Sequence, residues 1–161
     1  MFENKIGFLA SLGFSRMPAK DVVKELKALG YSAVEWTGAH FHPRTKWLAQ
    51  LKELVETTRS GGLAISEVGF QQDFVCRDDA VREDRIAIFI EAIEACAAVG
   101  ISTINTFTGP APWMPDAPRI PKDISEGTAW QMVLDAFSTI VKALEKNKVH
   151  GAVEGVWGHL C

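Results

Sequence analysis

The sequence lacks the features that mark membrane, secreted and nucleic-acid-binding proteins. No apolar run approaches the roughly 18 residues that a membrane-spanning helix needs, and the N-terminal residues 1–5 do not have the layout of a signal peptide. The formal net charge is -3 and no dense run of Lys and Arg occurs, so nucleic-acid binding has no electrostatic support. We therefore expect a cytoplasmic protein whose partners include neither a nucleic acid nor a membrane.

Cysteine is scarce as well. The three cysteines are Cys76, Cys96 and Cys161; their number is odd, they are widely spaced, and they form no C-x-x-C pair. This pattern predicts free thiols in a reducing cytoplasm. Cys96 lies in an apolar helical run and is expected in the core. Neither Cys76 nor Cys96 lies at the end of a predicted strand, which argues against a cysteine nucleophile.

Several short catalytic motifs are also absent. The sequence contains no G-x-S-x-G, no P-loop and no H-E-x-x-H. The segment Ser11–Ser15, after the first predicted strand, lacks the G-x-G-x-x-G turn of dinucleotide-binding doubly wound sheets. Flavodoxin-like sheets need no such turn, so this absence alone leaves a doubly wound sheet open.

What the sequence does contain is a regular alternation of β-type and helical segments. Short apolar runs predict strands at Lys5–Ser11, Ser32–Gly38, Leu63–Phe70, Ile101–Thr108 and Val149–Trp157. Longer runs with helical spacing predict helices at Ala19–Leu29, Thr45–Ser60, Ala80–Val99 and Glu126–Asn147. Such alternation is typical of parallel βαβ units, whose right-handed crossovers place every helix on one side of a closing sheet.

The predicted fold is α/β, a partial (β/α)₈ TIM barrel of about four βα units plus a fifth strand. We expect residues 1–161 to form a single domain, the N-terminal half of such a barrel, because a whole barrel needs about 200 residues or more. The Pro-rich loop Gly109–Pro121 is long for a βα connection and is predicted to form a lid or rim over the strand ends.

The C-terminal ends of barrel strands carry the chemistry of this fold. That rule selects the candidate substrate-binding residues Glu35, His40, His42, Glu67, Asn105, Trp113 and His159, together with Glu154. Several acids in one cavity repel each other unless a cation or proton offsets them. A ring of carboxylates with nearby histidines suits a divalent metal such as Mn²⁺, Mg²⁺, Co²⁺ or Zn²⁺.

Each candidate also has a structural explanation. Glu154 lies in an apolar strand, where a lone acid is costly unless it is paired, which favours a functional role. Glu35 and Glu67 can equally form structural ion pairs. His40 and His42 follow Gly38 in a loop, where exposed histidines are common. Aromatic residues such as Trp113 usually serve packing, although a sugar ring stacks well on them.

Four segments give the chain a resemblance to a known family. They are Lys5-Ile-Gly-Phe, Leu26-Lys-Ala-Leu-Gly-Tyr-Ser-Ala-Val-Glu35, Ala95-Cys-Ala-Ala-Val-Gly-Ile-Ser-Thr-Ile-Asn105 and Val149-His-Gly-Ala-Val-Glu154. In their order and spacing they resemble the xylose isomerase-like TIM-barrel superfamily, in particular its sugar phosphate isomerase/epimerase branch. The endonuclease branch has histidines after its third and fourth strands. Gly69-Phe-Gln71 and Thr108-Gly109 stand there instead, which argues against a DNA-repair site with three zinc ions.

The resemblance implies a metal-dependent isomerase or epimerase that acts on a sugar, a sugar phosphate or a related hydroxy-carbonyl compound. A proton would move next to a carbonyl through an enediolate. Glu154 matches the family's glutamate at the end of strand five, a metal ligand that often acts as acid/base. The remaining ligands come from strands six to eight, which the chain lacks, so we expect its site to be incomplete and metal binding by this chain alone to be doubtful.

Two other functions stay open at this point. The same scaffold and metal site can support a dehydratase or lyase that acts on a polyol such as an inosose. Alternatively, the chain is a non-catalytic half-barrel that forms a homodimer or higher oligomer, because open edges of a parallel sheet rarely stay unpaired.

Overall fold

The computed structural model describes residues 4–160, in which strands and helices alternate as the sequence predicts. The strands are β1 (Gly7–Leu9), β2 (Ala33–Thr37), β3 (Ala64–Gly69), β4 (Thr103–Thr106) and β5 (His150–Val153). The helices are α1 (Ala19–Ala28), α2 (Leu48–Ser60), α3 (Asp79–Ala98) and α4 (Glu126–Asn147). Every strand pairs in parallel with the next, in the order β1-β2-β3-β4-β5. This is the predicted α/β arrangement of a partial TIM barrel.

The element boundaries differ from the predictions mainly in the strands, which are all shorter than expected. The apolar runs extend beyond the residues that pair, so β5 ends at Val153 although apolar residues continue toward Trp157. Helix α4 has the predicted bounds, whereas α2 begins three residues later than expected. The N–H groups of Thr45 and Lys46 both donate to His42 O in a turn, which delays the start of α2.

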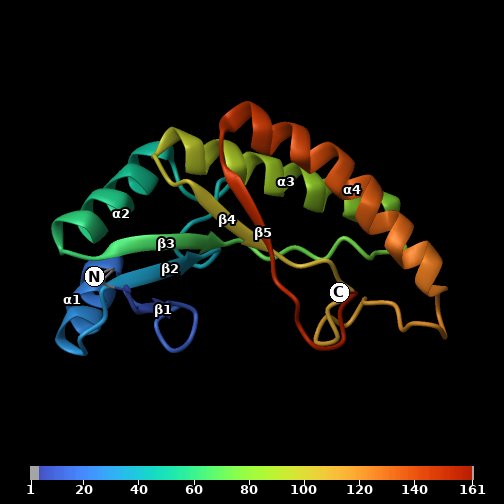
Figure 1. Cartoon of the computed structure of the whole chain (residues 1–161), viewed down its shortest axis with the longest axis horizontal. Helices are drawn as coiled ribbons and strands as arrows, with labels where there is room; N and C mark the ends of the chain where they lie inside the picture. The colour runs from blue at the N-terminus through green and yellow to red at the C-terminus, as the bar shows by residue number, and fades with distance from the viewer. Residues whose placement is uncertain (1–3, 161) are drawn as a thin grey trace.

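The helices lie along the outer, convex side of a curved sheet (Figure 1). Between the two layers lies the core, in which the side chains of Val34, Trp36, Val68 and Ile104 are fully buried. The indole N–H of Trp36 donates to Thr58 Oγ1 at 3.1 Å, and this hydroxyl donates to Leu54 O at 2.7 Å. Because these bonds satisfy the polar atoms, the large indole can be buried at no cost in unpaired groups.

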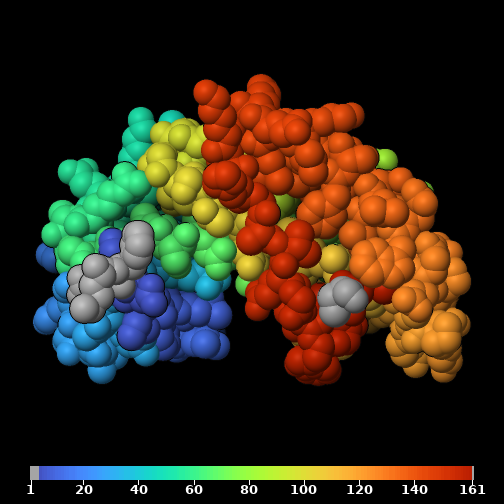
Figure 2. Space-filling model, in the orientation of Figure 1, coloured from blue at the N-terminus to red at the C-terminus, as the bar shows by residue number. Residues whose placement is uncertain are grey.

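The opposite, concave face of the sheet carries the alternate residues of each strand. Figure 2 shows this side as a broad notch between the N-terminal segments and the segment that follows β5. In the register of the sheet, Asn105 lies between Gly69 on β3 and Ala152 on β5. Since Ile104 belongs to the core layer, these neighbouring positions belong to the concave face.

A bulge interrupts the pairing of β2 with β3. Val34 pairs with Ile65 and Trp36 pairs with Val68, so Ser66 and Glu67 both lie opposite Glu35. Because of the extra residue, Glu67 lies on the same face of the sheet as Glu35, and Val68 lies on the core face with Trp36. Without the bulge, either Glu67 or Val68 would occupy the wrong face of the sheet.

Two of the cysteines are buried free thiols, as the sequence predicts. Cys76 and Cys96 are 4% and 0% exposed, and burial raises the pKa of the Cys96 thiol to about 12. Such a thiol is inert as a nucleophile. Cys161 lies outside the described residues. Within residues 4–160, no helix combines the length and the apolar character needed to cross a membrane.

The burial of Ile104 under the helices leads to a prediction about stability. Replacing Ile104 with Ala should lower the free energy of unfolding by about 2–5 kcal/mol, because it leaves a cavity in the core. The matched variant Leu134→Ala, at a side chain that is 59% exposed, should change it by less than about 0.5 kcal/mol. Urea unfolding followed by circular dichroism measures both. Equal effects of the two substitutions would contradict this description of the core.

Candidate active site

Three carboxylates are carried by the C-terminal parts of the strands. Glu35 belongs to β2, Glu67 to β3, and Glu154 follows β5 directly. Burial raises the pKa of Glu35 to about 7, and the negative charges of Glu67 and Glu154 add to this shift. Burial and the charge of Glu154 also raise the pKa of Glu67. These mutual effects mean that the three carboxylates share one electrostatic environment, as the sequence predicts for residues at strand ends.

The carboxylate of Glu35 lies across Gly69. A Cβ built at Gly69 would overlap Glu35 Oε1 and would lie 3.2 Å from Gln71 Nε2. Only glycine therefore leaves room for the carboxylate here. Nearby in the register are Thr37, paired with Gly69 on one side, and Asn105, paired with it on the other.

Thr37 and Asn105 form a polar floor at this point of the sheet. Both residues are buried, with 5% and 7% exposure. Among the residues that the structure describes, no group donates to or accepts from Thr37 Oγ1 or Asn105 Oδ1. Buried polar atoms are normally hydrogen-bonded, so these two are unsatisfied in the structure. The role of Asn105 as a substrate-binding residue stays a prediction.

The burial argument for Glu154 is wrong. Glu154 is exposed, because β5 is the outermost strand and no other strand among residues 4–160 pairs with its free edge. The cost of burying a lone acid therefore does not apply. The backbone N–H of Glu154 donates to Thr106 O at 2.9 Å, which continues the β4–β5 pairing and holds Glu154 on the concave face.

An aromatic cluster lies at the rim of the site, beyond the end of β4. The ring of Phe107 lies 5.8 Å from Trp113 and 4.9 Å from His159, and the last two rings are 5.2 Å apart, measured between centroids. Trp113 is 54% exposed. Burial lowers the pKa of His159, while the negative charges of Asp73 and Glu154 act in the opposite direction. The structure thus brings together Trp113 and His159, which the sequence analysis selected from distant segments.

Asp73 is a residue of this rim that the sequence analysis missed. Its carboxylate is buried and accepts the N–H of Val75 at 2.9 Å and that of Ala111 at 2.7 Å. Burial raises the pKa of Asp73, which these hydrogen bonds and the charge of Arg85 partly offset. Asp73 therefore fixes the start of the Pro-rich loop to the loop after β3. The same rule that selected Glu35 and Glu154, an acid shortly after a predicted strand, could have found it.

A pocket of about 340 Å³ opens beside this rim. It is lined by Gln71, Gln72, Asp73, Arg85, Phe107, Ala111, Trp113 and Met114. Amides, a guanidinium and two aromatic rings are groups that can hydrogen-bond hydroxyls and stack on an apolar ring face. The predicted role of Gly109–Pro121 as a rim agrees with this position.

His40 lies apart from the carboxylates. Its Nε2 is 2.8 Å from Met17 O, and its ring centroid is 4.8 Å from that of Trp36. Since Trp36 points into the core between sheet and helices, His40 lies on the helix side of β2. The structure therefore does not bring His40 together with Glu35, although the two are close in sequence.

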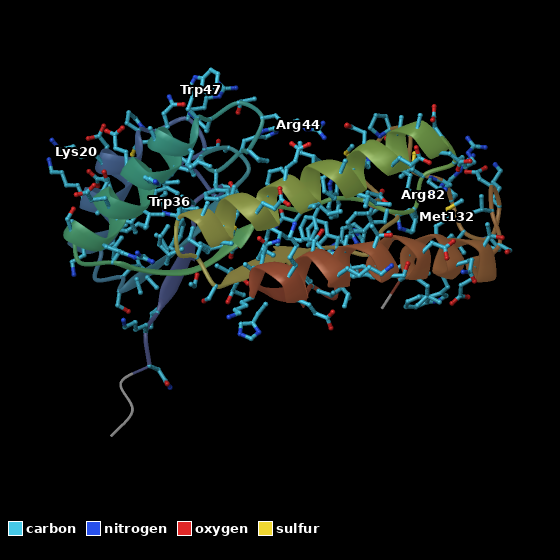
Figure 3. All side chains as sticks on the ribbon, turned by 90° about the horizontal axis from the view of Figure 1, so that it is seen from above. Lys20, Trp36, Arg44, Trp47, Arg82 and Met132 are labelled. Carbon is cyan, nitrogen blue, oxygen red and sulfur yellow. The ribbon has the colours of Figure 1, made fainter. Side chains whose placement is uncertain are left out.

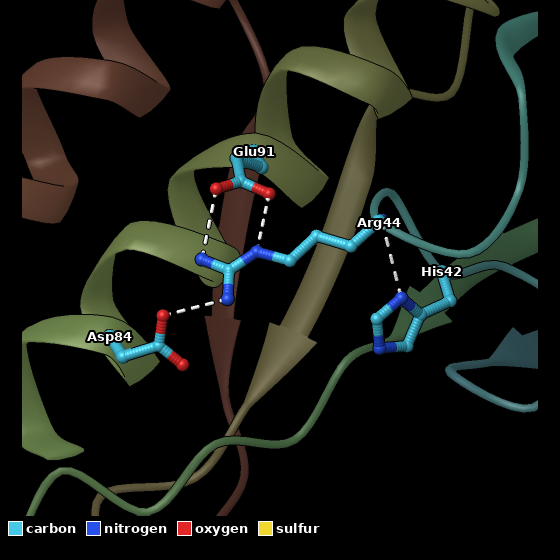
Figure 4. A network of polar contacts seen from close by, with 4 residues as sticks. All are labelled: His42, Arg44, Asp84 and Glu91. Atoms are coloured by element: carbon cyan, nitrogen blue, oxygen red, sulfur yellow. Dashed lines mark hydrogen bonds and ion pairs between the residues drawn. The ribbon is translucent and has the colours of Figure 1, made fainter.

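His42 is held by two contacts, and its ring partner Phe70 belongs to the core layer and not to the concave face. Its ring packs edge-on against Phe70 with centroids 5.5 Å apart, and its Nδ1 accepts the backbone N–H of Arg44 at 3.3 Å. Arg44 in turn binds α3, donating to Glu91 at 2.8 and 2.9 Å and to Asp84 at 2.7 Å (Figure 4). The two hydrogen bonds to Glu91 and the one to Asp84 tie the β2–α2 loop, and with it His42, to helix α3.

Carboxylate oxygens are suitable ligands for a divalent cation. Among residues 4–160, however, too few of them lie close together to form a complete binding site. Carboxylate oxygens are preferred ligands of Mn²⁺ and Mg²⁺, and a cation would relieve the repulsion that raises the pKa values of Glu35 and Glu67. Yet within residues 4–160 no three His, Cys, Asp or Glu side chains converge closely enough to hold a metal ion. A metal site in this chain therefore stays a prediction.

Comparison with known proteins now identifies the family. The sequence profile of the xylose isomerase-like TIM barrel matches residues 23–161. The chain belongs to this family. The resemblance to this family is thereby confirmed, and three of the four sequence segments lie within the matched residues. No curated protein sequence matches the chain.

Solved structures of the xylose isomerase-like barrel share the fold. D-psicose 3-epimerase from Clostridium cellulolyticum is 15% identical with a TM-score of 0.74, over 95% of this chain and 53% of that one. A 3-keto-D-glucoside 4-epimerase from E. coli is 16% identical with a TM-score of 0.74, over 98% and 58%. Mannonate dehydratase from Streptococcus suis is 16% identical with a TM-score of 0.66, over 92% and 51%. The chain thus spans a little over half the length of these proteins.

The raised pKa of Glu35 makes stability depend on pH in a defined direction. Between its ordinary pKa of 4.5 and the folded value of about 7, the folded state holds more protons than the unfolded state. The protonated Glu35 carboxyl therefore adds to the free energy of unfolding at low pH, and this contribution is lost as the pH rises through about 7. Since Gln cannot ionise, Glu35→Gln should raise the urea midpoint relative to the unsubstituted chain above pH 7, and this gain should vanish below pH 4.5.

The control for this experiment is Glu83→Gln, at an exposed glutamate of α3. Urea unfolding of all three proteins is measured in buffer with a chelator, so that no cation screens the carboxylates. A gain from Glu35→Gln that is the same at every pH, or that Glu83→Gln reproduces, would show that Glu35 ionises as an ordinary glutamate.

Proposed function

We propose that this chain provides the carboxylate part of the active site of a sugar isomerase or epimerase, or of an enzyme that acts on a related sugar phosphate or hydroxy-carbonyl compound. The observation that carries the proposal is the set of coupled carboxylates Glu35, Glu67 and Glu154 on the concave face. Membership of the xylose isomerase-like family supports it, as do the sugar epimerases among the structures of the same fold.

In the proposed reaction a carboxylate removes the proton next to a carbonyl and returns it from the other side or to the neighbouring carbon, through an enediolate. Glu154 is the proposed acid/base because it lies on the concave face at the end of β5 and is open to substrate. A divalent metal (Mn²⁺, Mg²⁺, Co²⁺ or Zn²⁺) with Glu154 among its ligands would polarise the carbonyl. The family resemblance implies that the partner acid/base and the remaining metal ligands lie on strands six to eight, which are not among the described residues.

The other residues of the concave face and rim are proposed to bind substrate. Asn105 offers its free Oδ1 to a hydroxyl, and Trp113 with His159 offers aromatic faces for stacking. Glu35, with its pKa of about 7, holds a proton for part of the time at neutral pH and can then donate a hydrogen bond. Glu67 lies on the same face as Glu35, and the roles of Glu67 and His42 as substrate ligands stay predictions.

The raised pKa of Glu35 also supports a second candidate function, that of a dehydratase that acts on a polyol or sugar acid. Loss of water requires an acid that protonates the departing hydroxyl, and a carboxyl with a pKa near 7 is suited to this. Mannonate dehydratase shares the fold. Product analysis separates the two reactions, since an epimer keeps the mass of the substrate and a dehydrated product is lighter by one water.

Removing Glu154 tests the proposed metal ligand. Mn²⁺ is titrated into the chain and the free ion is followed by electron paramagnetic resonance. Glu154→Gln should weaken Mn²⁺ binding by about ten-fold or more, because a charged ligand is lost. Glu145→Gln, at an exposed glutamate of α4, should leave binding unchanged.

A panel of ketohexoses that includes D-fructose and D-tagatose tests turnover by the same proteins. If Mn²⁺ binds equally well to the chain and to the Glu154→Gln variant, Glu154 is not a ligand. Turnover that survives Glu154→Gln would remove Glu154 from the chemistry.

The edges of the sheet support a further part of the proposal, which is self-association of a chain that folds as one domain in the cytoplasm. Strands β1 and β5 each pair on one side only within residues 4–160, and Val153 on β5 is 51% exposed. Light scattering after gel filtration should show dimers whose fraction grows with concentration. Val153→Lys should shift them toward monomers, whereas Val141→Lys on the exposed side of α4 should not. Monomers at every concentration would exclude this association.

A further inference from the structure

A second pocket lies on the helix side of the sheet, away from the carboxylates. It has a volume of about 450 Å³ and lies between the loop after β1, the start of α1 and helix α2. Its lining includes Arg16, Ala19, Lys20, His40, Lys46 and Glu53. Figure 3 shows Lys20 and Trp36 at this end of the molecule, which α1 and α2 form. The volume is in the range of sites for small molecules.

This pocket has more cationic than anionic side chains, although the whole chain has a net charge of -3. Arg16, Lys20 and Lys46 line it and only one carboxylate, Glu53, opposes them. In the part of the chain that the structure describes, none of these three cations takes part in an ion pair. Lys46 is only partly exposed, so its charge is less screened than that of a surface lysine. The pocket therefore attracts anions.

The start of α1 adds backbone donors to the same pocket. Pro18 precedes the helix and has no side chain that can cap it. Among the described residues no acceptor binds the N–H groups of Ala19 or Lys20, both of which line the pocket. Free N–H groups and the helix dipole favour an anion here, although the acidic Asp21 in the first turn weakens this field.

His40 supplies an independent indication of a ligand. Its Nε2 lies 2.8 Å from Met17 O and therefore carries the proton that the carbonyl accepts. Its Nδ1 is buried and has no partner within residues 4–160. In this tautomer Nδ1 is an acceptor, which can take a hydrogen bond from the O–H of a monoprotonated phosphate. The ring is held by Trp36, which is itself anchored to Thr58.

From the cavity, the unpaired cations and the buried ring nitrogen, we propose that this pocket binds a phosphoryl group, either inorganic phosphate or the phosphate of a small metabolite. The cations suit the negative charge of the phosphoryl group and the N–H donors suit its oxygens, while His40 Nδ1 can accept the O–H of a phosphate that carries a proton. The site is separate from the carboxylates, because His40 lies on the helix side of β2 and Glu35 on the concave side. It does not depend on the proposed isomerase function.

The test is a titration of the chain with inorganic phosphate at constant ionic strength, followed by calorimetry and by amide and imidazole NMR signals. We expect saturable binding at one site, with shifts at Ala19, Lys20 and His40. Lys46→Gln should weaken binding by about ten-fold or more, since a charged hydrogen bond is lost. Lys20→Gln, at an exposed side chain, should act in the same direction and guards against misfolding of the first variant.

Lys24→Gln is the matched control, because Lys24 is on the same helix but lines the neighbouring groove between α1 and α2 instead of this pocket. It should leave phosphate affinity unchanged. Fructose 6-phosphate and fructose form the second arm of the experiment. Tighter binding of the phosphate ester than of inorganic phosphate identifies a phosphorylated metabolite as the ligand, and equal binding identifies free phosphate.

The proposal is overturned if phosphate does not saturate, or if Lys24→Gln weakens binding as much as Lys46→Gln and Lys20→Gln. The latter result would place the anion in the groove lined by Lys24. Neither measurement uses turnover or Glu154, so the outcome is independent of whether the chain contributes to an isomerase.

Discussion

The helices cover only one face of the sheet, and the rest of the structure depends on this constraint. Right-handed crossovers between parallel strands place all four helices on the convex side. The pleat then divides each strand between an apolar layer and a polar face. Trp36 and Ile104 belong to the first, and Glu35 and Asn105, their immediate neighbours, to the second. One alternation thus produces both the core and the candidate active site.

The bulge between β2 and β3 shows how much this division depends on register. If Glu67 followed the unbroken alternation from Ile65, it would lie beside Ile65 in the apolar layer, where an unpaired carboxylate is costly. With Ser66 as the extra residue, Glu67 joins Glu35 on the concave face and Val68 stays in the core. A single inserted position therefore decides whether these two strands carry one carboxylate to the site or two.

The sequence predicted those features that follow from periodicity. The alternation of elements, the bounds of α4, and the positions of Glu35 and Asn105 on the strands follow directly from the spacing of apolar residues, whereas the face that Glu67 occupies depends on the bulge. Features that depend on the path of a loop were not predictable in this way. His40 follows β2 by three residues, but the turn returns it to Trp36 on the helix side. Nor could the sequence alone predict that Asp73 accepts the N–H of Ala111, 38 residues further along the chain.

Two loop anchors, both built on carboxylates, hold the loops after β2 and β3 in different ways. Asp73 is buried and bonds backbone N–H groups, so bulk salt has little access to it, and protonation is what would release Ala111 and the Pro-rich loop. Arg44 binds Glu91 and Asp84 near the surface, where salt screens the attraction. We therefore expect acid to release the Pro-rich loop that carries Trp113, and high ionic strength to loosen the β2–α2 loop that carries His42. A movement of either loop can then be assigned to its anchor by the condition that produces it.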